Sequence, residues 1–103
     1  MKFTIVDVPK MNDSMSRIVI GKGVFYIRFT YNDTNDYWSF GLYDHSRKPI
    51  YIGSKIVPGI PINLFTSIIK DTRIVFNAYS LNDRIGYEDF WNDNAKFFFY
   101  VAE

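Results

Sequence analysis

Cysteine is absent from the 103-residue chain, and histidine occurs once. Without a thiol the chain has no disulfide, no thiolate metal site and no cysteine nucleophile. The single histidine, His45, lies in the polar stretch 44–47, where a solvated turn residue explains it. No Ser–His–carboxylate grouping has local support, and one imidazole supplies too few ligands for a metal site. The sequence therefore predicts no enzymatic activity, and no catalytic, cofactor-binding or metal site.

An excess of charge is also missing, because 12 Lys and Arg stand against 11 Asp and Glu, for a net charge of +1. Proteins that bind the nucleic-acid backbone usually carry a basic excess or a basic patch. The balance of charge predicts no nucleic-acid partner, although it is compatible with a local basic patch. No apolar run approaches the ~18 residues of a membrane span, and residues 1–10 lack the apolar stretch of a signal peptide. We expect no membrane contact and a cytoplasmic location in the cell.

Aromatic residues are abundant, with ten Phe, eight Tyr and two Trp making up 19% of the chain. Large rings suit pleated, half-buried strands. Several segments also alternate between apolar and other residues with a period of two, which is the pattern of a half-buried strand. The side chains expected on the buried faces are Phe25, Ile27, Phe29, Tyr31, Trp38, Phe40, Leu42, Ile74, Phe76, Ala78, Phe97, Phe99 and Val101.

Turn-forming residues separate these segments. The stretch 32–36 consists of Asn, Asp and Thr, which favour a hairpin turn, and 21–23 and 44–47 are also turns. The pattern predicts strands over 17–20, 24–31, 37–43, 49–53, 72–79 and 96–102, with one helical turn at most, at 87–91. We expect a single all-β domain over residues 1–103, built as an antiparallel barrel or sandwich.

The segment 55–64 differs from the others because Pro58, Gly59 and Pro61 interrupt an apolar run. Proline cannot donate a hydrogen bond to a central ladder. This segment is therefore predicted to be an extended edge or a bend.

The faces opposite the expected core are not cleanly polar. One interpretation is a closed barrel or two-layer core that buries part of both faces, and the other is a surface that docks a partner. Exposed rings could also stack on single-stranded nucleic acid, so a strand-binding barrel is the alternative function. The residues concerned are Tyr26, Tyr37, Tyr43, Tyr51, Val75, Tyr79, Phe98 and Tyr100.

An ordered series of short motifs extends over about three-quarters of the chain. These motifs are Tyr31-Asn32, Tyr37-Trp38, Leu42-Tyr43-Asp44, Pro49-Ile50, Gly53, Ile56-Val57-Pro58-Gly59, Asn63-Leu64-Phe65, Gly86-Tyr87-Glu88-Asp89-Phe90 and Phe99-Tyr100. In their order and spacing the chain resembles the phage baseplate plug family, small tail proteins of contractile-tailed phages.

The resemblance implies a structural component of the tail baseplate, at the hub between the tail tube and the spike, without catalysis. Its implied partners are tube, hub and spike proteins and further copies of itself. Its implied location is the host cytoplasm during assembly and then the virion tail. Symmetric assembly would cover exposed aromatic faces and strand edges. The candidate assembly contacts are Ile56, Val57, Ile60, Ile62, Leu64, Phe65, Tyr26 and Tyr43.

Overall fold

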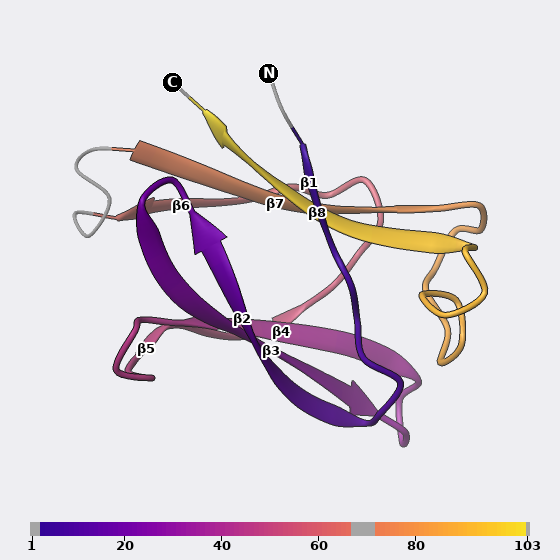
Figure 1. Cartoon of the computed structure of the whole chain (residues 1–103). Coiled ribbons are helices and arrows are strands. Elements are labelled where there is room, and N and C mark those ends of the chain that lie inside the picture. The colour runs from indigo at the N-terminus through magenta and orange to yellow at the C-terminus, as the bar shows by residue number, and fades with distance from the viewer. Residues whose placement is uncertain (1–2, 67–71, 103) are drawn as a thin grey trace. The chain divides into compact units, whose positions relative to one another are not determined.

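The computed structural model describes residues 3–66 and 72–102, and strands are its regular elements (Figure 1). The strands are β1 (Thr4–Val6), β2 (Asp13–Ile20), β3 (Gly23–Asn32), β4 (Tyr37–Tyr43), β5 (Pro49–Lys55), β6 (Ile62–Thr66), β7 (Thr72–Ser80) and β8 (Ala95–Ala102). The predicted all-β class is confirmed. No helix in the described ranges is long and apolar enough to cross a membrane.

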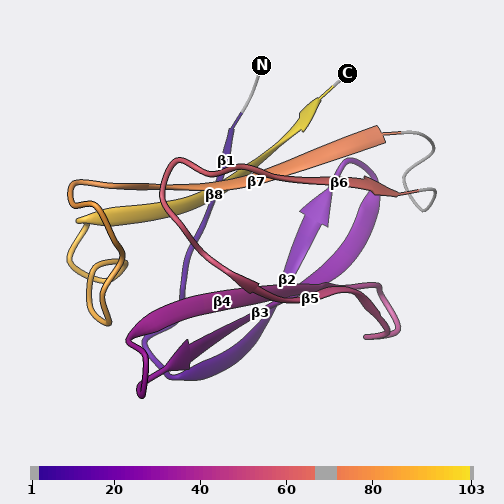
Figure 2. The same cartoon turned by 180° about the vertical axis from the view of Figure 1, so that it is seen from behind.

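The chain divides into two compact units, one formed by Met1–Val8 with Val57–Glu103 and the other by Pro9–Ile56. Each unit holds one antiparallel four-stranded sheet. The order is β1-β8-β7-β6 in the first and β2-β3-β4-β5 in the second (Figures 1 and 2). A single domain over the whole chain stays a prediction.

In the second unit, the buried residues of β3 and β4 face one another across the ladder. Phe29 pairs with Phe40, and Ile27 pairs with Leu42. These four side chains and Trp38 are at most 2% exposed. Fully burying a side chain of this size contributes roughly 1.5–3 kcal/mol, which holds the register because a slip of one residue would expose them all.

The turns of this sheet use the chemistry expected of Asn and Asp. Asn32 Oδ1 accepts a hydrogen bond from the Asn35 amide at 3.0 Å, and the Tyr31 hydroxyl donates to Asp36. Asp44 Oδ1 accepts bonds from the amides of Ser46 and Lys48, both at 2.8 Å. The predicted turns at 32–36 and 44–47 are confirmed.

In the first unit, the predicted alternation also gives the buried face. Phe76 pairs with Phe99, and the Phe76 ring lies 5.7 Å from that of Phe99 and 5.9 Å from that of Phe97. Ile74, one pair along the strand, is fully buried. The segment after β7 contains hydrogen-bonded turns and no helix; the Asn92 amide donates to the Glu88 carbonyl at 3.0 Å.

Two parts of the prediction need change, the position of Tyr51 and the strand β1. Tyr51 was expected opposite the buried face, but it pairs with Leu42 and its ring lies 5.8 Å from that of Phe40. Irregular register between β4 and β5, with Gly53 at a φ of 77°, breaks the simple alternation there. The strand β1 was not predicted. The proline-interrupted segment 55–64 leads into β6, which is an edge strand as expected.

Candidate assembly surfaces

The sheet of the second unit has one face opposite its buried residues, and we call it the tyrosine face. Tyr26 and Tyr43 pair across β3 and β4 on this face, and both are half-buried. The Arg47 guanidinium lies over the Tyr26 ring at 4.8 Å, and the Lys55 ammonium lies over the Tyr37 ring at 5.1 Å. Such cation–π contacts hold the rings in place at the surface.

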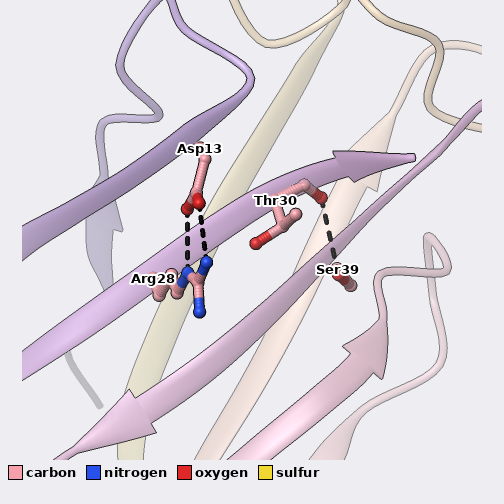
Figure 3. A network of polar contacts seen from close by, with 4 residues as sticks. All are labelled: Asp13, Arg28, Thr30 and Ser39. Carbon is pink, nitrogen blue, oxygen red and sulfur yellow. Dashed lines mark hydrogen bonds and ion pairs between the residues drawn. The ribbon is translucent and has the colours of Figure 1, made fainter. Parts of the chain in front are cut away.

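An ion pair joins β2 and β3 on the tyrosine face (Figure 3). Arg28 donates two hydrogen bonds to Asp13, of 2.8 and 2.6 Å. The bond from Arg28 lowers the pKa of Asp13 below its usual range. The same bond, and next the nearby Tyr43 hydroxyl, raise the pKa of Arg28. Both side chains are about half exposed, so the pair is a surface interaction that fixes geometry more than it stabilises.

Gly41 is buried between β3 and β5, on the side of the tyrosine face. A Cβ atom at this position would lie 3.2 Å from the Tyr51 carbonyl oxygen and 3.3 Å from a Tyr43 ring carbon. The neighbouring Ile52 is 60% exposed. The exposed Ile52 side chain therefore lies next to a tightly packed glycine rather than an open hollow.

The sheet of the first unit has its own exposed aromatic group, which we call the aromatic corner. The Phe3 ring packs edge-on against Phe98 at 5.4 Å and against Tyr100 at 5.2 Å. Phe3 is nevertheless 60% exposed, and the neighbouring Ile5 on β1 is 59% exposed. Edge-to-face packing of this kind pre-forms a rigid apolar surface at low entropic cost.

A shallow pocket of about 480 Å³ lies on the first unit. Its wall includes Pro58 and Gly59 on one side, and Asn77, Tyr79 and Phe98 of the sheet on the other. The Gly59 amide donates to the Ala78 carbonyl at 3.0 Å and so holds this wall against β7. The pocket offers polar groups, among them the Asp83 carboxylate, beside apolar rings.

The structure separates the predicted contacts of the segment 56–65. Ile56 is only 5% exposed and belongs to the core, whereas Ile60 is 59% exposed. Val57 is half-buried. Ile62 and Leu64 are half-buried opposite Phe76 and Ile74, on the core side of their sheet. The predicted contact of the Phe65 side chain falls outside the described side chains. An assembly role for these residues stays a prediction.

Several large exposed side chains were missed as candidates from the sequence. They lie in, or directly before, short or edge strands, where the sequence does not show whether a neighbouring strand covers the side chain. These residues are Phe3, Ile5, Met15, Val19 and Ile52. The alternation of apolar residues at 3 and 5 is the signal that was available for β1.

The polar residues show no converging chemistry in the described ranges. His45 is exposed in its turn. No group of three or more His, Asp or Glu side chains there could hold a metal ion. The aspartates at 13, 36, 44, 89 and 93 are engaged in turn or ion-pair bonds. The notable surfaces are therefore apolar and aromatic.

In a comparison with protein families, the chain matches the family described as "Cyanophage baseplate Pam3 plug gp18" over residues 3–103. The chain belongs to this baseplate plug family. It is a structural protein of a phage tail baseplate, its location is the virion tail, and its partners are other phage tail proteins. No curated protein matches the chain. For a plug protein, exposed aromatic faces are candidates for contact with neighbouring tail proteins.

Proposed function

We propose that this plug protein sits at the baseplate hub between the tail tube and the spike, and acts there in several copies by protein–protein assembly, without catalysis. The observation that carries the proposal is the set of large apolar side chains left exposed on both units. Phe3, Ile5, Ile52 and Ile60 are each about 60% exposed. Large exposed apolar groups are typical of surfaces that become buried in an assembly.

The arrangement of these residues supports more than one contact surface. The tyrosine face belongs to one unit and the aromatic corner to the other. A hub protein must hold to neighbours on several sides, so separate apolar surfaces suit that position. The protein would be made in the host cytoplasm and then become part of the virion.

Single-strand nucleic-acid binding is the second candidate, and one observation favours it. The tyrosine face carries Arg47 and Lys55 over its rings. Aromatic platforms beside cations are typical of strand-binding surfaces. However, each of these cations already lies over a ring on which a base would stack. Binding of an oligonucleotide that weakens steeply with salt would favour this candidate over assembly.

The test is the composition of purified virions and their purified tails. We expect the protein in intact particles at a constant ratio to the tube protein, and cross-linked to tube and spike peptides in mass spectrometry. A phage with this gene interrupted should yield no complete baseplates. Presence in the lysate with absence from purified particles would overturn the proposal. Cross-links confined to sheath or head proteins would overturn the hub position alone.

A further inference from the structure

The outer edge of β2 is the basis of this inference, which does not depend on the proposed function. β2 is a terminal strand of its sheet, and it pairs with β3 over all eight residues with a continuous register. Along residues 3–66 and 72–102, no backbone hydrogen bond reaches β2 from its other side. Long regular edges of this kind are templates for pairing with another chain.

The ladder fixes which backbone groups face the open edge. The Tyr31 amide donates to the Asn12 carbonyl at 2.8 Å, which makes this a hydrogen-bonded pair one step before β2. Hydrogen-bonded pairs alternate along an antiparallel ladder. The even-numbered residues of β2 therefore bond to β3, and the amides and carbonyls of Asp13, Met15, Arg17 and Val19 point toward the open edge.

The side chains of the same residues lie on the tyrosine face and form a self-complementary series. Met15 and Val19 are 42% and 51% exposed, and Met11, just before the strand, is 52% exposed. Asp13 and Arg17 separate these apolar residues and are also exposed. The outward-facing side chains at 11, 13, 15, 17 and 19 are apolar, acidic, apolar, basic and apolar, with Met15 at the centre. An antiparallel copy of the same strand, centred on its own Met15, would place the acidic residue opposite the basic one.

We propose that the edge of β2 pairs with β2 of a second copy of this chain, antiparallel about a two-fold axis at Met15. In this register Asp13 lies opposite Arg17 of the second copy, twice by symmetry. Met15 lies opposite its own counterpart, and Val19 lies next to the bend at Met11, whose amide donates to the Pro9 carbonyl. Opposite charges and apolar pairs at facing positions are the pairs that stabilise sheets.

The neighbouring registers lack this complementarity. Moving the two-fold axis by two residues, which shifts the register by four, places Arg17 opposite Arg17 in one direction and Asp13 opposite Asp13 in the other. The intermediate registers place a charge opposite Met15. Like charges directly opposite one another destabilise a sheet. Asp13 can accept the additional bond because each carboxylate oxygen has two lone pairs and uses one for Arg28.

A buried hydroxyl on the other face of β2 supports the same register. Ser14 is 8% exposed, and within the described residues its Oγ atom has no hydrogen-bond partner. In the proposed pairing Ser14 lies opposite Ser16 of the second copy. They form a pair that is not bonded through the backbone, where side chains lie closest. Hydroxyl groups that face each other across two strands can form a hydrogen bond, and such a bond to Ser16 would give the Ser14 Oγ atom a partner.

Cysteine cross-linking tests the register directly, since the chain has no cysteine of its own. The Cα atoms of the two Met15 residues would be about 5.5 Å apart, within the roughly 4.4–6.8 Å that a disulfide spans. Oxidised Met15→Cys should run as a covalent dimer. Val19→Cys is the matched control, because its two copies would lie about 27 Å apart. Equal cross-linking of the two variants, or none of Met15→Cys, would overturn the register.

The oligomeric state of the purified full chain tests the edge itself, measured by sedimentation from micromolar concentration up to about 1 mM. Met15→Pro removes an amide that faces the open edge, so it should remain folded and be monomeric. Ser16→Pro, which removes a bond to β3, should unfold. Arg17→Glu should weaken the dimer about tenfold through two facing like-charge pairs. A wild-type monomer throughout, or a folded Met15→Pro dimer, would overturn the proposal.

Discussion

Arg28 and Asp13, fifteen residues apart in the sequence, form a two-point ion pair diagonally across the β2–β3 ladder. Arg28 pairs in register with Met15, and Asp13 pairs with Thr30, whose carbonyl accepts a bond from Ser39 of β4 at 3.4 Å (Figure 3). The polar contacts of the tyrosine face thus connect three adjacent strands. These contacts fix the position of the Asp13 carboxylate, which lies opposite Arg17 of the second copy in the proposed pairing.

The first prediction concerns the pH dependence of this ion pair. The pKa of Asp13 is lower in the folded protein, so the pair stabilises the fold above the unfolded-state pKa of about 3.9. That contribution is lost as the pH falls through the lower folded-state pKa. Asp13→Asn should lower the free energy of unfolding at pH 7 by about 0.2–1 kcal/mol, as for other exposed pairs. Urea titrations of monomer at several pH values would measure it.

The control for the ion pair is a double-mutant cycle with Arg28→Gln. If Asp13→Asn lowers the free energy of unfolding as much in the Arg28→Gln background as in the wild type, the ion pair contributes nothing to stability. A difference between wild type and Asp13→Asn that does not shrink as the pH is lowered would also contradict the prediction.

The second prediction concerns the core of the β3–β4 hairpin. Trp38 is fully buried. Its replacement by Ala should cost about 3–5 kcal/mol, a large part of the roughly 5–15 kcal/mol that holds a domain folded. Thermal unfolding followed by circular dichroism measures the loss. Tyr79→Ala is the control at an aromatic residue that is 55% exposed, and its effect should stay within about 0.5 kcal/mol. Equal losses would show that Trp38 is not a core residue.

The third prediction concerns the close packing at Gly41. A methyl group there meets backbone atoms of β5, the Tyr51 oxygen at 3.2 Å and the Ile52 Cα at 3.4 Å. Backbone atoms cannot rotate away, so Gly41→Ala should destabilise the fold by about 1–3 kcal/mol. Gly86→Ala is the matched control, since its nearest neighbour is the Asp89 carboxylate at 3.4 Å. Chemical denaturation of both variants gives the comparison, and an unchanged Gly41→Ala protein would refute the packing argument.

The fourth prediction separates surface from core in the segment that precedes and forms β6. Ile60 is 59% exposed, so Ile60→Asp should remain folded and should reduce incorporation into particles when it replaces the wild-type protein during infection. Ile62 pairs with the fully buried Phe76, so Ile62→Asp should lower stability by more than about 1 kcal/mol. Normal incorporation of Ile60→Asp would exclude this residue as an assembly contact.

Most strands were predictable because their residues alternate strictly and are bounded by turn formers. The buried faces of β3, β4, β7 and β8 follow from the period of two alone. Two residues depart from it: Val75 is only 3% exposed although it lies on the face opposite Phe76, and Tyr51 shows where the rule ends. Once the register between β4 and β5 becomes irregular, counting residues no longer gives the face on which a side chain lies.

β1 and the exposed surfaces were not predictable in the same way. β1 has three residues, so the alternation of Phe3 and Ile5 is too short to predict a strand by itself, and its partner β8 lies at the other end of the chain. Exposure of Phe3 or Met15 depends on how many strands lie beside each residue, which local sequence does not encode. The same reason explains why Ile56 is buried and Ile60 is exposed within one apolar segment.

The sequence by itself determined the all-β class, the positions of the turns and the side chains that form the core, because these depend on neighbours two to five residues away. It also carried the motifs that resemble the plug family. The tertiary structure alone decided which strands are edges and which apolar residues stay exposed, because these depend on contacts between distant segments. The open edge of β2 belongs to this second class, since its unpaired backbone groups are defined only once β3 has taken the other side.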